Sequence, residues 1–295
     1  MKILRTPEQR FENLPDYPFE PNYLEVDGMR MHYVDEGPKD GQVVLLLHGE
    51  PSWSYLYRKM ITPIAQAGYR VLAPDLIGFG KSDKPSKISD YSYQQHMDWL
   101  GAWADQLALK DIILFCQDWG SLLGLRMVGE QPDRFARVML SNGILSTGER
   151  PMPKAFLAWR AFAKYSPFFP IGKIIEKATV TELPKAVVAA YNAPFPSEKY
   201  KAGARAFPGL VPASTNDPAS AACIAAAANL AKFEKPFLTV FGKADPILGR
   251  GDKPMQALVP GSQGQPHDRI YGGHFVQEDC GEELAKRLID WCKAS

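Results

Sequence analysis

One stretch near the middle of the chain decides the fold, and it reads Phe115-Cys116-Gln117-Asp118-Trp119-Gly120-Ser121-Leu122-Leu123-Gly124. Residues 112–116 form a continuous apolar run that predicts a buried strand. Residues 121–131 have the pattern of a helix, which Pro132 ends. A strand, one sharp turn and a helix therefore follow in direct succession. Hydrolases present a nucleophile from such a turn, and here Asp118 lies at its apex.

The residue type at the apex indicates the chemistry. Serine hydrolases read G-x-S-x-G at this place, and their serine needs a base to become nucleophilic. The carboxylate of Asp118 is already ionised at neutral pH, so it can attack a saturated carbon and expel a leaving group. The N-terminus of the following helix also favours an anion. The alternative interpretation is that Asp118 only caps this helix, as aspartate often does.

Outward from this turn, strand and helix patterns alternate. We predict strands at residues 23–26, 29–34, 43–47, 70–73, 112–116, 138–140, 236–241 and 269–271, and helices at residues 53–67, 93–109, 121–131 and 282–291. This alternation indicates an α/β fold with a mostly parallel, eight-stranded sheet flanked by helices. Residues 148–231 are rich in alanine, proline and aromatic residues and show no clear strand, so we predict a helical cap there. The sheet domain then comprises residues 1–147 and 232–295.

Composition excludes several classes of function. The 295 residues are 45% hydrophobic and 23% charged with a net charge of +1, so no bulk charge favours nucleic acid or an anionic membrane. The longest apolar runs have the length of a strand, and residues 1–18 show no secretory signal. The four cysteines form no CxxC pair, which favours free thiols in the cytoplasm. Motifs for metal or dinucleotide binding are missing, so we expect neither a metal nor a cofactor.

Two further loops contain candidate catalytic residues. His274 lies in a glycine-containing loop after the last predicted strand and is a candidate base. Asp245 follows the strand at 236–241 and could orient the His274 imidazole. The rival place for the acid is the loop after the strand at 138–140, where Asn142 offers only an amide. We therefore predict a triad of Asp118, Asp245 and His274.

The segment His48-Gly49-Glu50-Pro51 follows the strand at 43–47, where this kind of fold places a donor to an oxyanion. We expect the backbone N–H groups of Glu50 and Trp119 to form the oxyanion hole. The Glu50 side chain could hold the hydrolytic water or order the site. We expect His48 to order the loop rather than to act as a catalyst.

These motifs together resemble the haloalkane dehalogenases, members of the α/β-hydrolase fold. The resemblance runs from residues 48–55 through Gln117-Asp118-Trp119-Gly120 and the cap to His274. It is closest to the branch of the family whose acid follows the seventh strand.

In that branch, two indole N–H groups hold the halide. Trp119 matches the first, and Trp159, in the segment Phe156-Leu157-Ala158-Trp159, matches the second. An indole donates one hydrogen bond and accepts none, which suits a departing anion. Without the resemblance, we would interpret Trp159 as a residue that packs the cap against the sheet domain.

The resemblance also implies an apolar substrate pocket. Its expected members are Phe156, Phe207, Pro208, Val211, Ile247 and Leu248. Each of them is also compatible with an ordinary core position. Leu122 stands where the family can carry a larger aromatic residue, which leaves the size of the pocket open.

The implied function is hydrolysis of a haloalkane to a primary alcohol and a halide, through an ester on Asp118. The expected partners are a small halogenated alkane and water, with no nucleic acid or membrane, and we expect a monomer.

An epoxide hydrolase shares the fold and the nucleophile but needs two acidic cap tyrosines, for which Tyr165, Tyr191 and Tyr200 are available. Glu50 and the Phe156/Trp159 pair argue against it. A fluoroacetate dehalogenase would carry arginine in place of Trp119. A catalytically silent binding protein is the alternative outside the enzymes.

Overall fold

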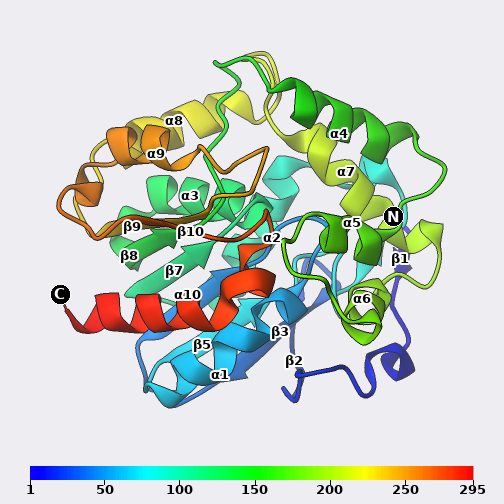
Figure 1. Ribbon diagram of the computed structural model, residues 1–295. Helices are drawn as coiled ribbons and strands as arrows, with labels where there is room; N and C mark the ends of the chain where they lie inside the picture. The colour runs from blue at the N-terminus through cyan, green and yellow to red at the C-terminus, as the bar shows by residue number, and fades with distance from the viewer. Residues whose placement is uncertain (295) are drawn as a thin grey trace.

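A sheet of eight strands runs through the centre of the molecule (Figure 1). This computed structural model describes residues 1–294. The strands are β2 (Asn22–Val26), β3 (Met29–Glu36), β4 (Val43–Leu47), β5 (Arg70–Pro74), β7 (Ile112–Cys116), β8 (Phe135–Leu140), β9 (Phe237–Gly242) and β10 (Asp268–Ile270). Their order is β10-β9-β8-β7-β4-β5-β3-β2. The six strands from β10 to β5 are parallel, and β3 and β2 are antiparallel to their neighbours. The predicted α/β-hydrolase fold with a mostly parallel, eight-stranded sheet is confirmed.

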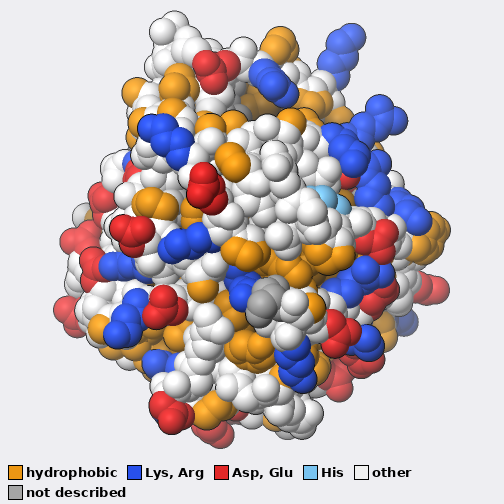
Figure 2. Space-filling view, turned by 90° about the vertical axis from the view of Figure 1, so that its left-hand side faces the viewer, with side chains coloured by type: hydrophobic (Ala, Val, Ile, Leu, Met, Phe, Trp, Pro, Cys, Tyr) orange, Lys and Arg blue, Asp and Glu red, His pale blue; other side chains and the backbone are white. Residues whose placement is uncertain are grey.

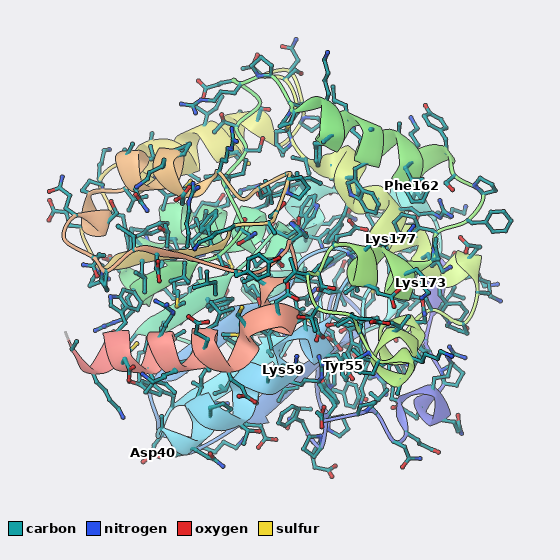
Figure 3. The ribbon with its side chains drawn as sticks, viewed as in Figure 1. Asp40, Tyr55, Lys59, Phe162, Lys173 and Lys177 are labelled. Carbon is teal, nitrogen blue, oxygen red and sulfur yellow. The ribbon has the colours of Figure 1, made fainter. Side chains whose placement is uncertain are left out.

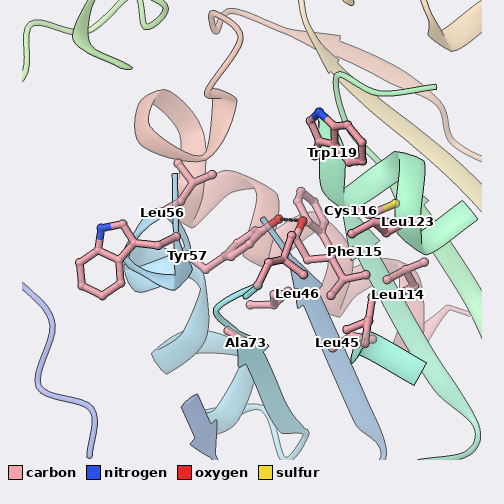
Figure 4. Close-up of a cluster of buried hydrophobic side chains, with 14 of the residues drawn as sticks. Leu45, Leu46, Leu56, Tyr57, Ala73, Leu114, Phe115, Cys116, Trp119 and Leu123 are labelled. Atoms are coloured by element: carbon pink, nitrogen blue, oxygen red, sulfur yellow. Dashed lines mark hydrogen bonds between the residues drawn. The ribbon is translucent and has the colours of Figure 1, made fainter. Parts of the chain in front are cut away.

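The central strands are covered on both faces. Every residue of β4, β7 and β9 is buried, which is why β4 and β7 are continuous apolar runs in the sequence and β9 is interrupted only by Thr239. Figure 4 shows part of this core, with Leu45 and Leu46 from β4 beside Leu114 and Phe115 from β7. Tyr57 also lies in this cluster, and its hydroxyl donates a hydrogen bond to the Leu47 carbonyl at 2.7 Å. The core therefore fixes the strand ends that carry the site.

Helices of the sheet domain lie on both faces of the sheet. They are α1 (Arg58–Gln66), α2 (Tyr93–Gln106), α3 (Trp119–Glu130), α9 (Asp252–Leu258) and α10 (Val276–Lys293). Helices α1 and α10 pack together on one face, and α2 and α3 lie on the other (Figure 1). No helix within residues 1–294 has the length and hydropathy needed to span a bilayer.

Five helices lie between β8 and β9. They are α4 (Lys154–Tyr165), α5 (Ile171–Lys177), α6 (Lys185–Asn192), α7 (Ala202–Leu210) and α8 (Ser220–Leu230). Helices α4 to α7 gather on one side of the molecule, whereas α8 packs against α3 (Figure 1). The contact between α3 and α8 is close, because a Cβ atom on Gly129 would lie 2.4 Å from the Ala226 carbonyl oxygen. The cap boundaries at residues 148 and 231 remain a prediction.

Short elements complete the chain. Strands β1 (Ile3–Leu4) and β6 (Lys84–Pro85) form a separate two-stranded antiparallel sheet, which the sequence did not predict. The 3-10 helices are η1 (Glu8–Phe11), η2 (Ser54–Tyr57), η3 (Ile88–Asp90), η4 (Pro132–Arg134), η5 (Glu198–Lys201) and η6 (Pro260–Ser262). The helix predicted at residues 53–67 thus divides into η2 and α1. The last helix begins at Val276, earlier than the predicted residue 282.

Candidate active site

Asp118 occupies the turn between β7 and α3. Its φ of 51° and ψ of −124° lie in a region that residues with a side chain rarely adopt. Helix α3 approaches β4 so closely that a Cβ on Gly120 would lie 1.9 Å from the Leu47 carbonyl oxygen, so only glycine fits there. The Asp118 side chain accepts no capping hydrogen bond from α3. The alternative that Asp118 serves only as a helix cap is therefore wrong.

His274 lies between two carboxylates. Its Nδ1 is 2.9 Å from Oδ2 of Asp245, and its Nε2 is 3.5 Å from Oδ2 of Asp118. The three residues follow β10, β9 and β7, so the carboxyl ends of parallel strands bring them together. Burial acts to lower the pKa of His274, but the charges of Asp245 and Asp118 outweigh it and raise that pKa to about 10.

Asp245 is held by several donors besides His274. The backbone N–H groups of Ile247 and Leu248 donate to Oδ1 at 2.8 and 3.0 Å, and Asn142 Nδ2 donates to Oδ2 at 2.9 Å. Burial acts to raise the pKa of Asp245, but His274, Asn142 and the Leu248 N–H together hold it below its usual range. The carboxylate is therefore ionised and can orient the imidazole.

Two amide side chains contact the triad, and sequence reasoning gave neither of them a role. Asn142, which lies at the rival position for the acid, donates a hydrogen bond to Asp245. Gln117 is buried, and its Nε2 lies 3.2 Å from His274 Nε2 and donates to the His274 carbonyl oxygen at 3.1 Å. Both amides follow neighbouring strands at the same sheet edge, and this shared position is the signal that could have identified them.

The loop after β4 contacts the nucleophile directly. The Glu50 N–H donates to Oδ1 of Asp118 at 2.7 Å. The Glu50 side chain is buried, and burial together with the charge of Asp118 raises the pKa of its carboxyl well above the usual range. Nδ1 of His48 lies 2.9 Å from the Gly49 carbonyl, and its Nε2 accepts from the Leu76 N–H at 3.0 Å. Because both His48 nitrogens are bound to backbone, this ring orders the loop.

Both candidate halide donors border one cavity. Trp119 is 2% exposed, and Trp159 projects from α4 toward the same space. Trp159 packs against Phe162 and Phe169, with ring centroids 5.7 and 5.6 Å apart. Figure 3 labels Phe162 among the helices of the cap, beside α4. The Trp159 indole also acts as a hydrogen-bond donor that lowers the pKa of Glu50, against the larger effect of burial.

The cavity has a volume of about 650 Å³, a size typical of sites for small molecules. It is bordered by Asp118, His274, Asp245 and Glu50, and by the expected residues Phe156, Pro208, Val211, Ile247 and Leu248. Leu122 also borders it. The assignment of Phe207 is wrong. Its ring lies outside the cavity wall, 4.2 Å from the Trp119 ring and 4.7 Å from the Phe79 ring, because it packs behind Trp119.

Comparisons with known proteins agree on one family. The family model described as "alpha/beta hydrolase fold" matches residues 42–279. The chain is 58% identical over 299 residues to a haloalkane dehalogenase of Mycolicibacterium paratuberculosis, an alignment that covers 100% of this chain and 99% of that protein. It is 55% identical to a haloalkane dehalogenase of Psychrobacter cryohalolentis, over 99% of this chain and 98% of the relative. Among solved structures, haloalkane dehalogenase DpaA from Paraglaciecola agarilytica, described as tetrameric, superimposes with a TM-score of 0.91 at 38% identity over 97% of both chains.

Proposed function

Because the chain belongs to the haloalkane dehalogenase family of the α/β-hydrolase fold, we propose that it hydrolyses the carbon–halogen bond of terminal haloalkanes through an ester on Asp118. One observation carries the assignment of roles. The Asp118 carboxylate borders a cavity that Trp119 and Trp159 also border, and His274 faces the same carboxylate. This arrangement supports the assignment of a nucleophile, two neutral donors and a base around one space.

The first step is displacement of halide. An oxygen of Asp118 attacks the halogen-bearing carbon, the carbon–halogen bond breaks with its electron pair, and an alkyl ester forms. The indole N–H groups of Trp119 and Trp159 stabilise the departing halide in a site that is largely shielded from water. Because these donors are neutral, the product anion forms no ion pair with them and can leave.

The second step is hydrolysis of the ester. His274 takes a proton from water, and the resulting hydroxide attacks the carbonyl carbon of the Asp118 ester. Asp245 orients the imidazole and stabilises its protonated form. The backbone N–H groups of Glu50 and Trp119 stabilise the oxyanion. Alcohol, halide and one proton leave, which balances the addition of one water molecule to the haloalkane.

Formation of the ester also prepares the base. In the free enzyme, the negative charge of Asp118 is one of the causes that raise the pKa of His274. Alkylation removes this charge, so the pKa of His274 falls and the neutral imidazole becomes more accessible. The base therefore gains its active form after the nucleophile has reacted.

The cavity does not favour the epoxide hydrolase alternative. Within residues 1–294, no tyrosine borders the cavity. Tyr165 is 74% exposed, and the buried Tyr191 donates its hydroxyl proton to Glu278. Tyr200 packs against the core. An epoxide oxygen would thus lack the pair of acids that its opening requires.

The deciding experiment measures halide release from 1-bromobutane and 1,2-dibromoethane, with styrene oxide as the test for epoxide opening. We expect turnover of the bromides by the wild type and none by Asp118→Ala. His274→Gln should release one bromide per active site and then stop as the alkyl-enzyme, because its first step is intact. Bromide release by Asp118→Ala at the wild-type rate would refute the mechanism, and so would sustained turnover by His274→Gln.

We also propose that the enzyme acts in the cytoplasm, with haloalkane and water as its only partners. The four cysteines are free thiols, two of them buried, which supports a reducing compartment.

A further inference from the structure

The first turn of α10 connects the loop of His274 with the cap. Asp279 lies in this turn, and its Oδ2 accepts a hydrogen bond of 2.7 Å from the N–H of Gly273, the residue before His274. Because this bond is to the backbone, Asp279 fixes the backbone position of the loop that carries His274.

The same carboxylate also binds the cap. Its Oδ1 accepts from the N–H groups of Val180 and Thr181 at 3.1 and 2.8 Å. These two residues belong to the segment that links α5 to α6. One side chain therefore holds two loops that lie about a hundred residues apart in the sequence.

The two loops also touch each other. The His274 N–H donates to the Ala178 carbonyl oxygen at 2.7 Å, and a Cβ on Gly273 would lie 2.4 Å from that oxygen. Ala178, Thr179 and Val180 border the cavity together with Gly273 and His274. The loop of the base and this part of the cavity wall thus form one unit.

The turn that carries Asp279 is firmly held. The neighbouring Glu278 is buried, forms an ion pair with Arg58 of α1 and accepts the hydroxyl proton of Tyr191 of α6. Lys59 donates to the Glu278 carbonyl oxygen at 2.6 Å. Figure 3 labels Lys59 on the side of the sheet domain and Lys177, at the end of α5, on the side of the cap. Asp279 therefore acts from a fixed support.

We propose that Asp279 is a positioning residue for hydrolysis of the ester: its carboxylate joins the loop of His274 to the cap loop at residues 178–181 and so sets the imidazole opposite Asp118. This inference rests on the proposed function. His274 Nε2 lies 3.5 Å from Oδ2 of Asp118, so the position of the imidazole allows little error. A displacement of a catalytic group by about 1 Å can lower the rate about a hundredfold. Because His274 acts only in the second step, loss of the clamp should slow hydrolysis and leave displacement of halide nearly unchanged.

The test is Asp279→Asn, which keeps the shape of the side chain. An amide has one acceptor oxygen, and its NH₂ group cannot accept from a backbone N–H, so the bond either to Gly273 or to the cap loop is lost. In rapid-mixing experiments with 1-bromobutane, we expect the bromide burst to stay within about threefold of the wild type and steady-state turnover to fall about tenfold. Intact-protein mass spectrometry should then show the alkyl-enzyme accumulating.

The matched control is Glu283→Gln, which removes an acid from the same helix. Glu283 pairs with Arg287 on the exposed side of α10 and touches neither loop, so both kinetic phases should match the wild type. If Asp279→Asn does not fold, Gly273→Ala tests the same contact by pushing the loops apart, with the same expected kinetics.

The inference is overturned if the variant leaves both phases unchanged or slows both by the same factor. It is also overturned if the variant lowers only the unfolding temperature. A wild-type enzyme that releases no bromide would instead refute the proposed function, so the two failures are distinguishable.

Discussion

The charge of His274 depends on its two carboxylate neighbours. Asp245 and Asp118 raise the pKa of His274 from 6.5 to about 10 against the opposing effect of burial. The imidazole of the free enzyme is then protonated at neutral pH and forms an ion pair with Asp118. Since the side chains of His274 and Asp118 are 13% and 19% exposed, solvent weakens this pair only in part.

A titration can check this assignment. We expect the imidazole of His274 to titrate near pH 10 in the wild type and at a clearly lower pH in Asp118→Asn, because the variant lacks one of the two charges. NMR of the imidazole carbon-bound protons measures both values. An unchanged pKa in the variant would contradict the coupling between the two residues.

The same shift has a consequence for stability. A histidine whose pKa is higher in the folded than in the unfolded protein stabilises the fold fully below its unfolded pKa of about 6.5. This contribution is lost as the pH rises toward about 10. The free energy of unfolding of the wild type should therefore decline over this range more steeply than that of His274→Gln, as measured by urea denaturation.

The triad residues could be predicted because each follows a recognisable strand. Parallel strands end at one edge, so residues after 112–116, 236–241 and 269–271 had to meet. Phe207 was assigned wrongly because it neighbours Pro208 on α7, and the sequence does not say which of the two borders the cavity. The contact of Asp279 with the loop of His274 depends on tertiary geometry, and no local pattern indicates it.

Helices α1, α6 and α10 meet at one buried ion pair. The Arg58 and Glu278 side chains are 2% and 0% exposed, and Arg58 Nη2 donates to Glu278 Oε2 at 2.9 Å. Burial acts to raise the pKa of Glu278, but its bonds with Arg58 and Tyr191 lower it, so the carboxylate stays charged. A buried pair of this kind costs much more to break than a surface pair.

Glu278→Gln should therefore destabilise the protein by about 3 kcal/mol, because Arg58 would remain buried without its counter-charge. Glu283→Gln, which breaks an exposed pair on the same helix, should cost at most about 0.5 kcal/mol. Urea denaturation followed by circular dichroism measures both. Equal effects of the two substitutions would show that the buried pair contributes no more than a surface pair.

Strongly patterned elements were predicted best. All eight strands of the main sheet exist, and the strand at 112–116 has the predicted bounds. β8 begins at Phe135, before the predicted residue 138. The sequence did not indicate this earlier start, because Ala136 and Arg137 interrupt the apolar pattern and are only half-buried. β1 and β6 have two residues each, too few to show any periodicity. Next to this sheet, Arg5 forms an ion pair with Asp83 at 2.7 Å, a contact that only the fold reveals.

The outer surface of the cap bears on how copies of the chain associate. Leu157, Phe162, Tyr165 and Phe168 are exposed on or just after α4. The helix carries the basic residues Lys154, Arg160 and Lys164 and no acidic one. Figure 2 shows the face on the left of Figure 1, where acidic and basic side chains are interspersed. A symmetric contact through α4 would bring like charges together, which opposes it.

We therefore expect a monomer of 32.8 kDa at physiological ionic strength. Light scattering after size-exclusion chromatography measures the mass directly. If repulsion between the basic side chains of α4 keeps two copies apart, high salt should screen this repulsion and promote association through the apolar face of α4. A stable tetramer at low salt, the state described for DpaA, would show this expectation to be wrong.

The five helices from α4 to α8 leave the sheet after β8 and return at β9, and these two strands are direct neighbours. Because the two strands are parallel, the polypeptide leaves at the carboxyl end of β8 and re-enters at the amino end of its neighbour β9. Insertions or deletions between these points need not alter the register of any strand. Evolution, or an engineer exchanging these helices between relatives, can accordingly remodel which molecules are admitted while the reacting groups stay in place.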